Sequence, residues 1–171
     1  AQALKGAGCA SVACGIESGS NKMLRAMKKG ATAEAMAVGV RALKNAGLSV
    51  VTYLIIGAPG ETEEDRNLTL QLGEDMDPDI VQIHIFASYP GTEAFQVRPD
   101  LGVNGATKFT PAGGRADEQD LIRIQKAFYR KFYLRPHRLV HHALQRIQRI
   151  ISDPQGEISA AWRLFRHAAS P

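Results

Sequence analysis

Short apolar runs alternate with segments of helical periodicity along the first half of the chain. Residues 10–17, 48–56 and 80–86 are predicted to be buried strands, and the second of these runs is apolar or β-branched at nearly every position. Such an unbroken run is typical of a parallel strand that is covered on both faces. Helical segments separate the strands, and connections of this kind make neighbouring strands parallel. The pattern therefore predicts an α/β fold with the order β-α-α-β-α-β.

Helix boundaries are marked by capping residues and breakers. A helix is expected to start after Ser20 and to run through Lys29, and a second one starts at Thr32. The run Thr62-Glu63-Glu64-Asp65 has the form of a capping box, with acidic side chains at the positive end of the helix dipole. Asp77-Pro78 should end that helix before the third strand.

The chain divides into three predicted regions. Residues 1–95 hold the strands, residues 96–116 are a loop rich in Gly, Pro and Thr, and residues 117–171 form a helical tail interrupted at Arg135-Pro136. Three parallel strands are fewer than an independent domain usually has. We therefore expect the first region to be part of a barrel or sheet whose remaining strands lie outside this chain.

Charge is unevenly distributed along the sequence. The 171 residues carry a net charge of +4, yet residues 121–150 contain eight Lys or Arg and no Asp or Glu. This basic stretch is either an ordinary solvated face or a surface for anionic lipid, an acidic substrate or RNA. His137 and His141 lie four residues apart there, but Arg138 stands where a zinc protease motif needs Glu, so no metal site is predicted.

The cysteines and the hydropathy pattern indicate a protein of the reducing cytoplasm. Cys9 and Cys14 are the only two cysteines, which implies no disulfide framework, and both are expected to be buried structural thiols. No apolar stretch is long enough to span a membrane. The expected location is cytoplasmic, with the basic tail able to sit at a membrane periphery.

The candidate chemistry lies in the turns that follow the three predicted strands. Glu17-Ser18-Gly19-Ser20 offers a carboxylate and free backbone N–H groups to the ribose or amino group of a ligand. The alternative is that Glu17 pairs with a nearby Lys or Arg and that Ser20 is only a helix cap.

The second and third turns leave similar alternatives open. Gly57-Ala58-Pro59-Gly60-Glu61-Thr62 lets a ligand approach the backbone closely, or it is simply a tight βα turn. It lacks the Gly-Lys-Ser/Thr ending of a phosphate-binding loop. Tyr89 either stacks on a planar ligand or packs with its hydroxyl in water.

Four motifs in order resemble the radical S-adenosylmethionine enzymes, and most closely their subgroup with an N-terminal cobalamin-binding domain. The matching segments are Gly15–Ser20, Lys29-Gly30-Ala31-Thr32, Gly57–Thr62 and Tyr89–Thr92, and Phe132–Pro136 is similar to the tail helices of that subgroup.

The resemblance implies a partial TIM-type (β/α) barrel, of which this chain supplies the second half, followed by C-terminal α-helices. It implies that Glu17 and Ser18 contact the ribose or amino-acid part of S-adenosylmethionine, that Ile55 backs the adenine, and that the residues after the third strand border adenine or substrate. Tyr53 stands where some relatives have an acidic ribose ligand. The predicted cofactor-binding residues are Glu17, Ser18, Ser20, Ile55, Gly57, Pro59 and Tyr89.

The resemblance also implies a 4Fe–4S cluster and, in the methyltransferases of the subgroup, cobalamin. The CxxxCxxC motif that holds the cluster is absent from this chain, as is a cobalamin-binding domain. The expected partners are therefore the N-terminal half of the barrel, the cobalamin-binding domain and a small-molecule, lipid or tetrapyrrole-like substrate, and the chain alone should not catalyse. The competing hypotheses are an RNA-modifying methylthiotransferase and a non-catalytic module that binds an anionic membrane or nucleic acid, with nucleic acid the less favoured partner.

Overall fold

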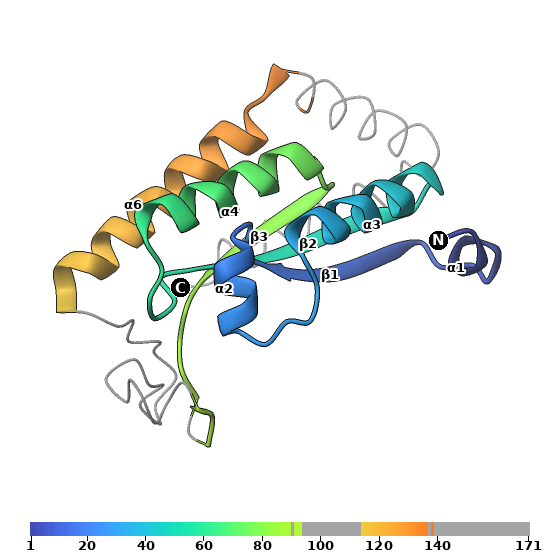
Figure 1. Cartoon of the computed structure of the whole chain (residues 1–171). Coiled ribbons are helices and arrows are strands. Elements are labelled where there is room, and N and C mark those ends of the chain that lie inside the picture. Colours follow the sequence, from blue (N-terminus) through green and yellow to red (C-terminus); the bar gives the residue numbers. More distant parts are fainter. Residues whose placement is uncertain (90, 94–113, 137, 139–171) are drawn as a thin grey trace, which may run out of the picture. The chain divides into compact units, whose positions relative to one another are not determined.

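The computed structural model of this chain describes residues 1–89, 91–93, 114–136 and 138 (Figure 1). For residues 114–118 it describes the backbone alone. The chain forms two compact units, residues 1–128 and residues 129–171. Most of the predicted loop over 96–116 and the tail beyond Arg138 lie outside the described residues, as do His137 and His141.

The first unit is built on a sheet of three parallel strands. These are β1 (Ser11–Glu17), β2 (Ser49–Ile56) and β3 (Ile80–Ile85), in the spatial order β1-β2-β3. The predicted α/β class with parallel strands is confirmed, and the arrangement is that of a fragment of a β/α barrel. Because the strands are parallel, the carboxyl ends of all three lie at the same end of the sheet.

Helices connect the strands as the capping residues predict. The connecting helices are α2 (Asn21–Ala26), α3 (Ala33–Asn45) and α4 (Glu63–Met76), while α1 (Gln2–Gly6) precedes β1 and α6 (Gly114–Tyr133) follows β3. Ser20, Thr32 and Thr62 cap α2, α3 and α4 through their side chains, and Thr62 forms a capping box with Asp65. Asp77 adopts a left-handed conformation and ends α4, which confirms the predicted break.

Two predicted helix boundaries are wrong. The helix after Ser20 ends at Ala26 rather than Lys29, because Lys28 adopts a left-handed φ of 55° before Gly30. The first helix after the predicted loop begins at Gly114 rather than Asp117, so residues 114–116 are helical. Gly114 gave no capping signal in the sequence, which is why the loop prediction extended over it.

One face of the sheet is packed under helices and forms the core of the unit. Figure 1 shows α3 and α4 on this side, and α3 contacts β1 and β2 while α4 contacts β2. The buried strand residues on this helix-covered face are Ile16, Val50, Thr52, Leu54, Ile56, Val81 and Ile83. Their alternation along each strand follows the two-residue period of a β-strand.

The part of α6 that belongs to the first unit completes this layer. A Cβ atom added to Gly57 would lie 2.6 Å from a methyl carbon of Leu121, and one added to Gly73 would lie 3.3 Å from the ring of Phe128. Gln125 donates a hydrogen bond of 2.6 Å to the carbonyl of Ile83 on β3. Two glycines thus make room for the apolar face of α6.

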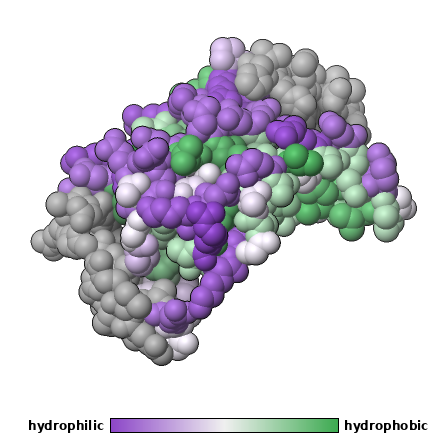
Figure 2. Space-filling view, viewed as in Figure 1, coloured by the Kyte–Doolittle hydropathy of each residue, from purple (hydrophilic) through white to green (hydrophobic). Residues whose placement is uncertain are grey.

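The opposite face of the sheet, which we call the open face, carries half-buried and exposed residues. It is formed by Ala13, Gly15, Val51, Tyr53, Ile55, Ile80, Gln82 and His84, as the strand registers show. Strand β2 was predicted to be covered on both faces, yet Val51, Tyr53 and Ile55 are only half-buried. Figure 2 shows apolar surface along the β1 side of the molecule, beneath a largely hydrophilic helical layer.

The described part of the second unit is organised around Phe132. This side chain is fully buried, and the guanidinium carbon of Arg138 lies 3.8 Å from the centre of its ring, a cation–π contact. Tyr133 meets Phe132 edge to face, with the ring centres 5.0 Å apart. None of the helices in the described parts of the chain is long and apolar enough to cross a membrane.

Candidate functional site

Glu17 ends β1 in a strained conformation that directs its carboxylate over the open face. Its φ is +65°, and the N–H of Ser18 donates a hydrogen bond of 2.8 Å to the carbonyl of Ile16, which closes a three-residue turn. The strand register also shifts between Gly15 and Glu17, so that Ile16 forms a bulge. Bulges and left-handed non-glycine residues at strand ends are a common way of aiming a functional side chain.

The carboxylate of Glu17 rests on Gly15 and pairs with Lys29. The Nζ atom of Lys29 lies 3.0 Å from Oε1 of Glu17, and both side chains are partly exposed. A Cβ atom on Gly15 would collide with this carboxylate and would lie 3.2 Å from the ammonium group. The absent side chain of Gly15 therefore creates the space in which an anion and a cation lie together on the open face.

Ser18 and Ser20 point into the protein rather than toward solvent. Both are buried, and the hydroxyl of Ser18 lies 2.8 Å from that of Thr69 on α4. The hydroxyl of Ser20 donates a hydrogen bond of 2.6 Å to Asp65 and caps α2 by accepting from the N–H of Met23. The described contacts of both hydroxyls are thus with the protein itself.

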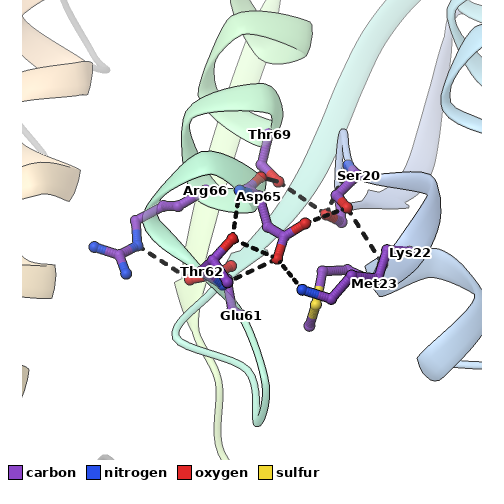
Figure 3. A network of polar contacts seen from close by, with 9 residues as sticks. Ser20, Lys22, Met23, Glu61, Thr62, Asp65, Arg66 and Thr69 are labelled. Carbon is purple, nitrogen blue, oxygen red and sulfur yellow. Dashed lines mark hydrogen bonds and ion pairs between the residues drawn. The ribbon is translucent and has the colours of Figure 1, made fainter.

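Asp65 is the centre of the polar network that joins the first turn to the start of α4 (Figure 3). Its Oδ2 atom accepts from Lys22 at 2.6 Å, and from the N–H and hydroxyl of Thr62 at 3.0 and 2.8 Å. The ammonium of Lys22, then the Ser20 hydroxyl and the N–H of Thr62, hold the pKa of Asp65 well below its usual range. Asp65 is therefore ionised at neutral pH, and the first two turns are joined by charge-assisted hydrogen bonds.

In the second turn, the side chain of Glu61 binds a backbone N–H group of the same turn. The carboxylate of Glu61, almost fully buried, accepts a hydrogen bond of 2.8 Å from the N–H of Gly57 and one of 3.1 Å from Arg66. Gly57 has a φ of +79°, which glycine adopts without strain. This N–H already has a partner in the turn, so the surface that this segment offers a ligand is that of Ile55 and the half-buried Pro59.

Polar and aromatic groups line the carboxyl half of the open face. Gly15, Tyr53 and Gln82 lie side by side in the register, and His84 lies diagonally beside Tyr53 with their ring centres 5.8 Å apart. The preceding row, Ala13 with Val51 and Ile80, is apolar. The open face thus combines an apolar floor with a polar rim at the strand ends, which is the usual location of ligand sites in α/β proteins.

Tyr89 lies beyond the end of β3 and about half of its surface is exposed. The hydroxyl of Thr92 donates a hydrogen bond of 2.7 Å to the carbonyl of Tyr89, which forms a turn there. Hydrogen bonds from Ser18 and Ser20 join the turn after Glu17 to α4, whereas the described contacts of Tyr89 are within its own turn. Its stacking on a planar ligand therefore stays a prediction.

The cysteines depart from the sequence-based expectation. Cys14 and Cys9 are free and half-buried rather than fully buried, and Cys9 precedes β1. Partial burial raises the pKa of the Cys14 thiol. The described residues contain no group of three or more potential metal ligands.

Three residues of the site escaped the sequence analysis. Lys29 was part of a motif, but its pairing with Glu17 depends on the left-handed turn at Lys28. Asp65 was identified as a helix cap, and Thr69 was not singled out at all. Their second role, binding a turn more than forty residues away, follows from the packing of α4 beside the first turn.

Comparison with known proteins gives a family match in this same part of the chain. Residues 1–73 match the family model described as the Radical SAM superfamily. An uncharacterized methyltransferase of Pyrococcus horikoshii is 30% identical over 148 residues, which cover 82% of this chain and 32% of that protein.

Other similar proteins are named as tRNA-modifying enzymes. The tRNA-2-methylthio-N(6)-dimethylallyladenosine synthase of Bordetella petrii is 39% identical over 87 residues, or 50% of this chain and 18% of that protein. The enzyme of the same name from Pseudoalteromonas atlantica is 36% identical over 88 residues. The chain spans about a third of the methyltransferase and about a fifth of the tRNA-modifying enzymes.

Proposed function

We propose that this chain is part of a radical S-adenosylmethionine enzyme and that its open face forms one wall of the cofactor cavity. The observation that carries the proposal is the coincidence of two features. The segment that matches the family model is the same one in which two strand-end turns are bonded together beside a paired carboxylate and ammonium.

The chemistry of the open face suits S-adenosylmethionine. Its amino-acid end carries an ammonium and a carboxylate, and Glu17 and Lys29 offer one charge of each opposite sign at a partly exposed position. Its adenine is a flat apolar surface, and the half-buried side chains of Ile55 and Tyr53 lie on the same face. Binding would exchange the ion pair within the protein for two ion pairs with the ligand.

The residues of this chain do not fit an iron–sulfur cluster. Three thiolates are needed for the cluster of this family, whereas the chain has two cysteines. A segment outside this chain would therefore hold the cluster. Cobalamin, if the enzyme uses it, would likewise be held by another domain.

The role of the chain's own residues would be to bind and orient. When bound next to a reduced cluster, S-adenosylmethionine supplies radical or methyl-transfer chemistry. Glu17 and Lys29 would fix its charged end, Ile55 and Tyr53 would exclude water from its adenosyl part, and Gln82 and His84 would face the substrate side of the open face.

Between the two reaction types that the relatives suggest, methyl transfer is favoured over methylthio transfer. The similarity to the methyltransferase extends over 148 residues, whereas the similarity to the tRNA-modifying enzymes covers half of this chain. A lipid or tetrapyrrole-like substrate at a membrane periphery remains part of the proposal. The RNA-modifying function is the second candidate, and it rests on the higher identity over those 87 residues.

The test uses the full reading frame that contains this chain, expressed without oxygen. Iron, sulfide and bound cobalamin are quantified, and the dissociation constant of S-adenosylmethionine is measured for the wild type and for Glu17→Gln. Loss of the carboxylate should weaken binding about tenfold or more, equivalent to about 1.4 kcal/mol. The matched control is Glu64→Gln on the exposed side of α4, which should bind as the wild type does.

Two results would contradict the proposal. One is a full-length protein that binds neither iron nor S-adenosylmethionine. The other is equal binding by the wild type and by Glu17→Gln. Release of 5′-deoxyadenosine by this chain alone, with a reductant, would overturn the expectation that the chain cannot catalyse by itself.

A further inference from the structure

The turn that carries Glu17 is held by two side chains of α4, Asp65 and Thr69. The hydroxyl of Thr69 donates its single proton to the carbonyl of Asp65, one helical turn earlier, at 2.9 Å. It can therefore act only as an acceptor toward the first turn, where it accepts from the N–H of Gly19 at 3.0 Å and from the hydroxyl of Ser18. One buried hydroxyl thus binds two successive residues of the turn.

Asp65 holds the next residue of the same turn. Its Oδ1 atom accepts from the hydroxyl of Ser20, while Oδ2 binds Lys22 and the N-cap of its own helix. Ser20 in turn donates its N–H to the hydroxyl of Ser18 at 3.1 Å. Three consecutive residues after Glu17 are therefore bonded to α4 or to one another through buried or part-buried contacts. Figure 3 shows the contact between Ser20 and Asp65.

The backbone of the turn also lies directly against the backbone of α4. A Cβ atom on Gly19 would collide with the carbonyl of Leu68 and would lie 2.8 Å from the nitrogen of Thr69. The close approach is needed for the N–H of Gly19 to reach the hydroxyl of Thr69. This close backbone contact restricts how the turn can shift along α4.

The fixed turn matters most for Glu17, because the backbone conformation of Glu17 is itself unfavourable. A positive φ is strained for a residue other than glycine and persists only where its surroundings impose it. The hydrogen bonds that follow immediately in the sequence are the surroundings that the structure shows.

We propose that Asp65 and Thr69 are positioning residues for the cofactor site, which set the place of the Glu17 carboxylate over Gly15 and thereby the affinity for the zwitterionic amino-acid end of the ligand. This inference rests on the proposed function. In this proposal neither Asp65 nor Thr69 touches the ligand, and both act through residues 18–20.

The ionised state of Asp65 supports this role. Its lowered pKa keeps the carboxylate charged throughout the neutral range. The groups that face it are Lys22, Ser20 and Thr62, and of these only Lys22 is charged. The hydrogen bonds that Asp65 accepts from the first turn should therefore not change around neutral pH.

The test compares Thr69→Val and Asp65→Asn with the wild type in the full-length, cluster-loaded enzyme. Both variants should raise the KM for S-adenosylmethionine about fivefold or more with a much smaller change in kcat. They should also speed the hydrogen exchange of the amides of Gly19 and Ser20. Thr69→Ser keeps the hydroxyl and should return the KM to within about twofold of the wild type.

The matched control is Thr52→Val, the same replacement at a buried threonine on the helix-covered face. The hydroxyl of Thr52 has no hydrogen-bond partner among the residues that the structure describes. This variant should leave both the KM and the exchange at Gly19 unchanged.

The outcomes distinguish the inference from the proposed function. Unchanged amide exchange in Thr69→Val, or a Thr69→Ser variant no better than Thr69→Val, would overturn the positioning role. An equal rise in KM in Thr52→Val would do the same, since the effect would then be general. Failure of the wild-type enzyme to bind S-adenosylmethionine would instead overturn the proposed function, while the exchange measurement would still report on the contacts of Asp65 and Thr69.

Discussion

At the scale of single residues, Gly19 leaves the least room for a side chain among the glycines compared in the described part of the chain. Substitution by alanine would place a methyl group against the backbone of Leu68, which cannot move without shifting α4. We expect Gly19→Ala to lower the free energy of unfolding by about 1–3 kcal/mol, the usual cost of overpacking. The measurement is urea denaturation followed by circular dichroism.

Gly39 is the control for this substitution. It lies in the interior of α3 and has nothing within 4 Å of the position that a Cβ atom would occupy. Gly39→Ala should therefore raise the free energy of unfolding by roughly 0.5–1 kcal/mol, because alanine has the higher helix propensity. Equal destabilisation by both substitutions would contradict the steric reading of the first turn.

The kinds of contact that the residues of the first turn make could be predicted from the sequence. The direction in which their side chains point could not. Ser20 was predicted either to bind a ligand or to cap a helix, and Glu17 either to bind a ligand or to form an ion pair. The structure shows the cap and the ion pair, and it leaves Glu17 partly exposed. Which way Ser18 and Ser20 point depends on α4, more than forty residues away, and no local pattern contains that information.

At the scale of elements, the link between α2 and α4 should make stability depend on pH. The folded pKa of Asp65 lies below its unfolded value of about 3.9, so the unfolded chain binds the proton more readily. The stabilisation is present above about pH 4 and is lost as the pH falls through the folded pKa. The stability difference between the wild type and Asp65→Asn should therefore be largest near pH 7 and shrink at lower pH.

Urea denaturation between pH 3 and pH 7 measures this difference. Ile83→Val is the control, since it removes a buried methyl group without removing a titrating group, at a cost of about 0.5–1.5 kcal/mol that should stay constant with pH. A pH-independent difference for Asp65→Asn would show that its charge does not stabilise the fold.

The packing of residues 114–128 of α6 on the rest of the first unit allows a second prediction at the scale of elements. Phe128 is buried against Gly73 of α4, and its ring fills the space that the glycine leaves. Phe128→Ala should lower the free energy of unfolding by about 3–5 kcal/mol through lost burial and the cavity that remains. The exposed neighbour Lys126 is the control, and Lys126→Ala should change stability by no more than about 0.5 kcal/mol.

The elements themselves were largely predictable, because strand runs, caps and breakers are local signals. The three strands, the caps at Ser20, Thr32 and Thr62 and the break at Asp77 agree with the structure. The environment of β2 was not predictable in the same way. Its apolar residues on both faces indicate two covered faces, and the structure covers one of them with the helices of this chain.

At the scale of the whole molecule, the open face and the outer edge of β1 are the parts of the sheet that the described helices and strands do not fully cover. In the sheet, β1 pairs with β2 on one side, and no other described strand pairs with its outer side. An unpaired parallel edge beside an apolar surface is a site of edge-to-edge association. This is the surface that the remaining strands of a barrel would cover in the proposed enzyme.

We therefore expect this chain by itself to self-associate through β1, and we expect a charge on that edge to prevent it. Ala13 lies exposed on the open face of β1, and Ala13→Lys should shift the species seen by sedimentation velocity toward monomer, because an edge lysine disfavours strand pairing. Val38→Lys is the matched control, since it also replaces an exposed apolar side chain by lysine, but on the solvent side of α3. If association persisted in Ala13→Lys but disappeared in Val38→Lys, the contact surface would be the helical layer, and the incomplete sheet would not be what drives association.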